Sequence, residues 1–157
     1  MPKLVDNYVL NRKIGAGQFG EVLKGYDRTT NNDIVVKVIK RENLKGKFVE
    51  LLENEIKVLK GCNNCNIIRL YDLKKTPNNF YLVLEYCNEG DLAAYVKRKK
   101  QLTEDEAVEF IVQIHHGFRT LVKNKILHRD FKLANILLHD GQIKIADFGF
   151  AKLLTEE

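Results

Sequence analysis

Four polar residues near the end of the chain stand at a spacing that suits phosphoryl transfer. Asp130 closes a His-Arg-Asp triplet, Lys132 and Asn135 follow within five residues, and Asp147 opens an Asp-Phe-Gly triplet. A carboxylate such as Asp130 can orient an attacking hydroxyl or accept its proton, and Lys132 can reach the transferring phosphate. Asn135 and Asp147 offer hard oxygen ligands of the kind that Mg²⁺ prefers when it bridges phosphates. The spacing therefore predicts a site that neutralises a phosphate chain and aims a hydroxyl at it.

The flanks of the Asp-Phe-Gly triplet decide how it is interpreted, because such a triplet alone is a turn in most proteins. Residues 136–138 and 143–145 are short apolar or alternating runs, and Asp140-Gly141 lies between them. This pattern is a strong hairpin signal. A hairpin between Asn135 and Asp147 supports the prediction that both belong to one site.

A second motif, G-x-G-x-x-G-x-V, runs from Gly15 to Val22. Alone it fits either a dinucleotide-binding fingerprint or a glycine-rich hairpin. A dinucleotide fold needs a helix after the glycines, but residues 22–26 continue as a β-type run that ends in the polar cluster 29–33. The flanks favour a strand, glycine loop and strand whose backbone N–H groups approach phosphates while Phe19 closes over them. A dinucleotide-dependent oxidoreductase is accordingly disfavoured.

Together these motifs resemble the eukaryotic protein kinases, from about Tyr8 to the last residues. The resemblance implies an α+β fold with a five-stranded antiparallel first lobe that carries one helix. The beginning of a mainly helical second lobe follows. The implied boundaries are 1–86 for the first lobe, 87–91 for the hinge and 92–157 for the partial second lobe. The implied cofactors are ATP and Mg²⁺.

Lys37 interrupts the apolar, β-branched run 34–39. A buried strand normally excludes such a charge, so a partner is expected. The resemblance implies that Lys37 contacts the α and β phosphates and a glutamate on the next helix, which apolar spacing between residues 48 and 59 predicts. Glu55 fits the family's E-I-x-x-L pattern and Glu53 competes for the role, while any of Glu50, Glu53 and Glu55 could be a solvated helix charge.

The resemblance also implies an adenine site. The Glu85 carbonyl and the Cys87 amide would bond the base, Leu84 would be the gatekeeper and Asp91 would lie near the ribose. Val22 and Val35 would cover one face of the base and Leu137 the other. The implied nucleotide-binding residues are Ile14, Gly15, Ala16, Gly17, Gln18, Phe19, Gly20, Val22, Val35, Lys37, Leu84, Glu85, Cys87, Asp91 and Leu137.

Further elements can be predicted from local patterns. Residues 66–71 and 80–86 are expected to be strands joined by a turn at 76–79, and a helix is expected over about 91–100. A second helix, about 104–123, begins at a Thr103-x-x-Glu106 capping box. Its expected buried face comprises Phe110, Ile111, Ile114, Phe118, Leu121 and Val122.

Composition limits the partners. The chain has 157 residues, 45% of them hydrophobic and 30% charged, with a formal net charge of +5. The basic run 97–100 lies where a helix is expected to end, which is more typical of a solvated terminus than of a nucleic-acid patch. With no long apolar run and no signal peptide, we expect no stable membrane insertion and a cytoplasmic location, with the nucleus as the alternative.

The cysteines and most histidines receive structural interpretations. Cys62 and Cys65 form a C-x-x-C pair, but two further ligands at matching spacing are absent from the sequence, so a metal or redox site is disfavoured. His115-His116 is more typical of surface or packing positions. The resemblance makes His128 a structural residue that stacks with Phe148, Leu59 and Leu70.

The Asp130-x-Lys132 pattern is that of the Ser/Thr kinases, so the expected partner is a protein with a Ser or Thr acceptor. Residues 85–95 and 147–152 are similar to the autophagy-initiating branch of these kinases. Three departures are Phe131 for the usual Leu, Leu133-Ala134 for Pro-Glu, and Val35 for a small Ala. The lost glutamate puts a preference for basic substrates in doubt.

The chain ends at Glu157, where the family continues its activation segment, and no A-P-E element is present. We expect Arg129 to lack a long loop to bind, with Thr155 as one phosphorylatable residue in range. Apolar undersides of the long helix and the catalytic loop are expected to lie partly exposed and to favour association. The alternative function is a non-catalytic nucleotide-binding or interaction module derived from a kinase.

Overall fold

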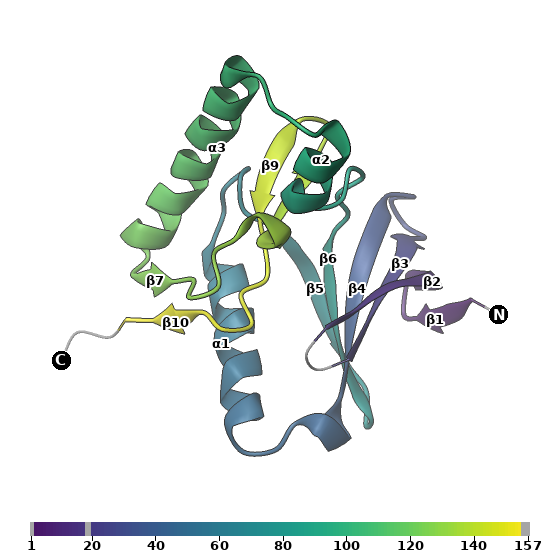
Figure 1. Cartoon of the computed structure of the whole chain (residues 1–157). Coiled ribbons are helices and arrows are strands. Elements are labelled where there is room, and N and C mark those ends of the chain that lie inside the picture. Colours follow the sequence, from purple (N-terminus) through teal and green to yellow (C-terminus); the bar gives the residue numbers. More distant parts are fainter. Residues whose placement is uncertain (1, 18–19, 155–157) are drawn as a thin grey trace. The chain divides into compact units, whose positions relative to one another are not determined.

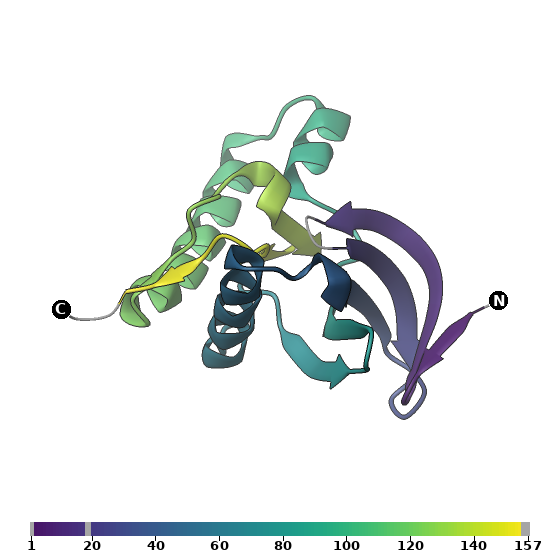
Figure 2. The ribbon, with the colours of Figure 1, turned by 90° about the horizontal axis from the view of Figure 1, so that it is seen from below.

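The structure is a computed structural model that describes residues 2–17 and 20–154. The chain divides into two compact units. The first comprises the residues up to Val49 together with Leu70–Tyr86, and the second comprises Glu50–Arg69 and the residues from Cys87 onward. Figures 1 and 2 show the ribbon from two directions. The predicted lobe boundaries stay a prediction, and packing assigns residues 50–69 to the second unit.

The first unit is built on one antiparallel sheet, drawn in purple to teal in Figure 1. Its strands are β1 (Lys3–Val5), β2 (Tyr8–Gly17), β3 (Gly20–Asp27), β4 (Asp33–Lys40), β5 (Leu70–Lys75) and β6 (Asn79–Glu85), in the order β1-β2-β3-β4-β6-β5. The predicted α+β fold with an antiparallel sheet is confirmed, but the predicted count of five strands is one too few. The additional strand, β1, has three residues and folds back on β2 through Asp6, whose φ is 53°. It is too short to show an alternating pattern in the sequence.

Alternating residues of β4 supply the centre of the first unit's core. Ile34, Val36 and Val38 are buried on one face, as expected for a strand whose side chains alternate. They pack with Val5, Leu10, Tyr81 and Val83. Lys37 stands between two of these core positions, so its side chain leaves the opposite face of the sheet.

The second unit contains most of the helical residues. Its elements are α1 (Lys47–Gly61, which begins in the first unit), α2 (Leu92–Lys99), α3 (Glu104–Lys123), β7 (Ile126–Leu127), β8 (Ile136–His139), β9 (Gln142–Ile145) and β10 (Lys152–Leu153). Short 3-10 turns cover Arg41–Asn43 in the first unit and Leu133–Asn135 in the second. Strand β7 pairs with β10, and β8 pairs with β9.

Two local predictions in the second unit are confirmed. The β8–β9 hairpin turns at Asp140 and Gly141, with φ values of 48° and 76°, as a two-residue turn with positive φ requires. At the start of α3, the Glu106 backbone N–H donates to Thr103 Oγ1 at 3.3 Å, and the Thr103 N–H donates to Glu106 Oε2 at 3.0 Å. This is the predicted capping box.

The buried face of α3 differs from the prediction. Phe110, Gly117 and Leu121 are buried, whereas Ile111, Phe118 and Val122 are 63%, 41% and 62% exposed. The helix contacts β9 through a stripe centred on Gly117, and a residue one position off that stripe is turned by about 100°. The expected exposure of apolar residues on this helix is thereby confirmed. None of the described helices is long and apolar enough to cross a bilayer.

The predicted strand over 66–71 begins only at Leu70, because Asn66 is bonded elsewhere. Its Nδ2 donates to the Ile143 carbonyl at 3.0 Å and to Gln113 Oε1 at 3.2 Å, and its Oδ1 accepts from His116 Nδ1 at 2.8 Å. The buried Asn66 thus joins the segment after α1 to both α3 and β9. An Asn within an apolar run is the sequence feature that could have indicated a buried, hydrogen-bonded side chain here.

We expect Gly117→Ala to lower the free energy of unfolding by about 1–3 kcal/mol, because the helix and the Asn66 segment leave no room for a methyl group. A Cβ at residue 117 would lie 2.8 Å from the Asn66 carbonyl oxygen and 2.9 Å from Ile145 Cδ1. Urea unfolding measures the change. The matched control is Gly61→Ala in α1, where a Cβ meets nothing within 4 Å and where alanine's higher helix propensity predicts no loss. Equal stabilities of the two variants would contradict the prediction.

Candidate active site

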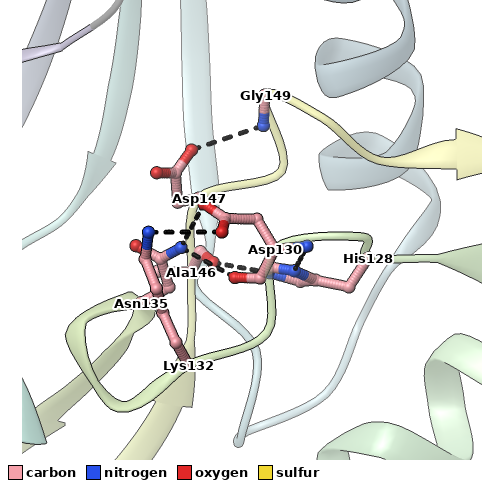
Figure 3. A network of polar contacts seen from close by, with 7 residues as sticks. All are labelled: His128, Asp130, Lys132, Asn135, Ala146, Asp147 and Gly149. Atoms are coloured by element: carbon pink, nitrogen blue, oxygen red, sulfur yellow. Dashed lines mark hydrogen bonds and ion pairs between the residues drawn. The ribbon is translucent and has the colours of Figure 1, made fainter.

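The β8–β9 hairpin holds residues 128–135, the catalytic loop, against the Asp-Phe-Gly segment. Strand β8 starts directly after Asn135, and β9 ends one residue before Ala146. The Ala146 N–H donates to the Asn135 carbonyl at 2.9 Å, and the Asn135 N–H donates to the Lys132 carbonyl at 2.9 Å. Figure 3 shows that the side chains of Asp130 and Asn135 meet and that Asp147 lies beside them. The hairpin therefore brings the sequence-predicted residues of the second unit together.

Asp130 is held by two neighbours. Lys132 Nζ lies 3.2 Å from Asp130 Oδ1, and Asn135 Nδ2 donates to Asp130 Oδ2 at 2.9 Å and to the Asp130 carbonyl at 2.8 Å. The hydrogen bond from Lys132 is the main cause that lowers the pKa of the Asp130 carboxyl, and the bond from Asn135 adds to it. The carboxylate is thus kept ionised and oriented, as an acceptor of a hydroxyl proton must be.

Replacing Lys132 is expected to change the titration of Asp130. In Lys132→Met the largest cause of the lowered pKa is lost, so protonation of Asp130 should occur at a higher pH than in the unchanged chain. Because the folded-state pKa is depressed, any stability linked to it is present at neutral pH and is lost as the pH falls. The ¹³C chemical shift of the Asp130 carboxyl, followed against pH, reports the midpoint. A midpoint unchanged from that of the exposed-site control Lys123→Met would contradict the assignment.

Asn135 and Asp147 form a donor set that fits a hard cation. The Asn135 Nδ2 atom is used by Asp130, so the amide oxygen is the atom that can bind a metal ion. Asp147 has a φ of 59°, and its Oδ1 accepts from the Gly149 N–H at 3.4 Å. A non-glycine residue held in this region stores strain, which is common at functional sites. An amide oxygen and a carboxylate suit Mg²⁺, which takes oxygen ligands from few protein groups.

His128 supports the loop from below rather than reacting. Its Nδ1 accepts from the Asp130 N–H at 3.3 Å, so its Nε2 carries the proton donated to the Ala146 carbonyl at 2.8 Å. The imidazole and the Phe148 ring lie 5.0 Å apart between centroids, which confirms the predicted stacking. The predicted contacts with Leu59 and Leu70 stay a prediction. His128 fixes the loop through both of its ring nitrogens.

Arg129, next to His128, also has a positive φ, 66°. Its Nε donates to the Phe150 carbonyl at 2.6 Å. This bond ties the catalytic loop to the segment after the Asp-Phe-Gly triplet. The expectation that Arg129 lacks a long loop to bind stays a prediction, and Thr155 lies outside the described residues.

Burial separates Glu55 from its competitors on α1. The Glu55 side chain is only 3% exposed, whereas Glu50 and Glu53 are exposed. A Cβ on Gly149 would lie 4.0 Å from Glu55 Oε2, so the carboxylate faces the Asp-Phe-Gly turn. A buried carboxylate requires a partner, and Glu55 is not without one. Its position fits the predicted inward-facing role.

In the first unit, Lys37 lies beneath the glycine segment. A Cβ on Gly17 would come within 3.5 Å of Lys37 Cε. At Gly20 a Cβ would lie 1.8 Å from the Val38 carbonyl oxygen, so only glycine allows β3 to pair with β4 there. The last glycine of the motif is thus explained by strand packing. Gln18 and Phe19, which the sequence assigns to the nucleotide, lie outside the described residues.

The remaining predicted nucleotide residues divide between the two units. In the first unit, Val35 is paired with Leu84 across β4 and β6, and Ile14, Gly15, Ala16, Val22 and Glu85 also lie on strands. In the second unit, Asp91 and Leu137 form an isolated bridge, and Cys87 is buried. Asp91 Oδ1 accepts from the Ala94 N–H at 2.8 Å and so caps α2. This structural role was not predicted, although an Asp before an apolar helix is its usual signal.

The chain is similar in sequence to a protein domain family and to several proteins of known name. The protein kinase domain family matches residues 8–157. The chain is 41% identical to serine/threonine-protein kinase ATG1c of Arabidopsis thaliana, 39% to atg1 of Dictyostelium discoideum and 42% to ULK1 of Homo sapiens. These alignments cover 97%, 97% and 96% of the chain but only 21%, 24% and 15% of the respective relatives. The chain therefore spans about a fifth of the length of these relatives. The predicted resemblance, including that to the autophagy-initiating branch, is confirmed.

Proposed function

Because this chain belongs to the protein kinase family, we propose that its residues transfer the γ-phosphoryl group of Mg²⁺-bound ATP to a Ser or Thr hydroxyl of a protein. The observation that carries this proposal is the joined cluster of Asp130, Lys132 and Asn135, with Asp147 beside it. In phosphoryl transfer the protein mainly positions groups and stabilises charge. A fixed carboxylate, a cation and two oxygen ligands supply those functions.

Each residue of the second unit takes one role in this proposal. Asp130 accepts or orients the proton of the acceptor hydroxyl, and Lys132 offsets charge on the transferring phosphate. Asn135 and Asp147 hold Mg²⁺, which neutralises the phosphate oxygens when bound. The existing 3.2 Å contact between Lys132 and Asp130 supports a shared position beside the acceptor.

ATP binding is proposed for the residues that the family resemblance implies. Lys37 binds the α and β phosphates and is oriented by Glu55. The glycine segment covers the phosphates with backbone N–H groups, for which the strand–loop–strand arrangement of β2 and β3 is suited. Glu85 and Cys87 bind adenine through backbone atoms, with Val22, Val35 and Leu137 against its faces. The lobes 1–86 and 92–157, the hinge 87–91 and a cytoplasmic location, where ATP is available, belong to the same proposal.

The acceptor is proposed to be a protein Ser or Thr. Support comes from the Asp-x-Lys pattern and from the relatives, whose names describe serine/threonine kinases. Ala134 stands where basophilic kinases use a glutamate, so we propose no requirement for a basic residue beside the acceptor. Nucleic acid is not a proposed partner.

The test is a phosphotransfer assay with radiolabelled ATP, Mg²⁺ and peptide mixtures that differ only in a Ser, Thr or Tyr acceptor. We expect label on Ser or Thr peptides. The variant Asp147→Asn, prepared in parallel, controls for a contaminating kinase. ATP binding without transfer to any acceptor would reject catalysis and favour the non-catalytic module.

A further inference from the structure

Four rings lie in a row between α3 and the Asp-Phe-Gly segment. Phe118 on α3 and Phe131 have centroids 5.5 Å apart at an interplanar angle of 72°. Phe131 and the His128 imidazole are 5.8 Å apart at 87°, and His128 and Phe148 are 5.0 Å apart at 60°. The first two pairs of this row, Phe118 with Phe131 and Phe131 with His128, are edge-to-face. Such pairs are favourable beyond the apolar area that they bury.

The row runs from solvent to the core. Phe118 and Phe131 are 41% and 44% exposed, whereas His128 is 4% exposed and Phe148 is fully buried. A half-exposed aromatic residue next to a polar loop needs a reason, because its apolar surface gains more when buried. Mutual contact and contact with a buried imidazole give Phe131 a defined position despite its exposure.

Phe131 directly follows Asp130 in the chain, so its backbone position limits where the carboxylate can lie. On one side, Lys132 and Asn135 hold the Asp130 carboxylate. On the other side, the Asp130 N–H is bonded to His128 Nδ1, and His128 is bonded to the Ala146 carbonyl. Phe131 contacts the same imidazole. It therefore supports the second of the two attachments of Asp130.

The far end of the row is anchored. Phe118 lies on α3 next to Gly117, where the helix is in tight contact with the Asn66 carbonyl and with Ile145 of β9. Helix α3 therefore contacts β9, the strand that precedes Asp147, through Gly117. It also contacts the loop that carries Asp130, through Phe118 and Phe131. Both the loop and the strand are thus positioned by the same helix.

We propose that Phe131 is a positioning residue, which together with Phe118 fixes the catalytic loop on α3 and so sets the position of Asp130. This inference rests on the proposed phosphotransfer function. Phe131 does not touch the reacting atoms in this proposal. Its effect should therefore appear in the turnover number and in loop dynamics rather than in nucleotide affinity.

The experiment compares Phe131→Ala, Phe118→Ala, the double variant and Phe131→Leu with the unchanged chain. The matched control is Ile111→Ala, a more exposed apolar residue of the same helix. Because small displacements of catalytic groups are costly, we expect each alanine variant to lower kcat about tenfold. The KM for ATP should stay within about twofold, as for an interaction that acts in the transition state. The double variant should resemble the single variants, since both remove one connection, and Phe131→Leu should recover part of the loss.

Amide hydrogen exchange gives a second readout that does not depend on activity. We expect faster exchange over residues 128–135 in Phe131→Ala and Phe118→Ala, and unchanged exchange there in Ile111→Ala. An inactive unchanged chain would reject the proposed function, while the exchange comparison would still test this inference. If Phe131→Ala loses its far-UV circular dichroism, Phe118→Ala and Phe131→Leu decide. Unchanged kcat and unchanged exchange in the alanine variants, or additive losses in the double variant, would overturn the proposal.

Discussion

Asp147→Asn is expected to lower kcat for phosphotransfer by at least about a thousandfold, because a ligand of the metal ion loses its negative charge. Asparagine suits the test, since it tolerates the left-handed backbone at φ 59° better than alanine does. It also keeps an oxygen that can accept from the Gly149 N–H. The fold should therefore persist while the site loses its charge. Single-turnover phosphotransfer measures the effect, and the Mg²⁺ concentration needed for half-maximal rate should rise.

Asp140→Asn is the matched control for this variant. Asp140 also has a positive φ, 48°, but it lies in the β8–β9 turn, exposed and away from Asn135. Asparagine is favoured in such a turn, so activity should be unchanged. A rate for Asp147→Asn within tenfold of that of Asp140→Asn would argue against Asp147 as a metal ligand.

The parts of the fold that could be predicted from the sequence are those fixed by neighbouring residues. Asp140-Gly141 specifies its own turn, and Thr103 with Glu106 specifies the start of α3, because the interacting groups are within three residues of each other. The position of Asn135 beside the Asp-Phe-Gly segment follows from that hairpin. The second unit's part of the site was therefore predictable from local patterns and from the family resemblance.

The parts that could not be predicted depend on contacts between distant segments. Asn66 leaves its expected strand for partners on α3 and β9 that lie about fifty or more residues further along the chain. Gly117, which hydrophobic periodicity ignores, selects the face of α3 that becomes buried, so that Ile111 is exposed instead. The ring contacts of Phe131 belong to the same class. In each case the deciding contact joins residues that are far apart in the sequence and close together in the fold.

At Glu55, the family sequence pattern and the burial seen in the structure agree. Helical spacing left Glu53 as the alternative to Glu55, and in the structure Glu55 is buried whereas Glu53 is exposed. The family pattern E-I-x-x-L had favoured the same residue. Its role toward Lys37 stays a prediction, since Lys37 belongs to the other unit.

Asp130→Asn is expected to lower kcat by about a hundredfold to ten-thousandfold, the contribution typical of a positioned acid or base. The substitution keeps the size of the side chain, and its amide oxygen can still contact Lys132 Nζ, which lies 3.2 Å from Oδ1. The substitution removes the negative charge that accepts a proton, together with the hydrogen bond that Oδ2 accepts from Asn135 Nδ2, whereas the bond from Asn135 Nδ2 to the backbone carbonyl of residue 130 is kept. Because Asp130 is proposed to face the acceptor hydroxyl and not the nucleotide, the Kd for ATP should change by less than about twofold.

Measuring both kcat and the Kd for ATP distinguishes a role of Asp130 as the base from a purely structural role. A variant whose loop had collapsed would lose ATP affinity together with kcat, so isothermal titration of ATP is measured on the same preparation as the rate. Asp105→Asn, an exposed substitution in the first turn of α3, controls for the loss of one negative charge. Lys132→Met should lower kcat further even when Asp130 is neutral, because Lys132 is proposed to offset charge on the transferring phosphate. Full activity in Asp130→Asn would remove the base from the proposed mechanism and leave only the charge-neutralising groups.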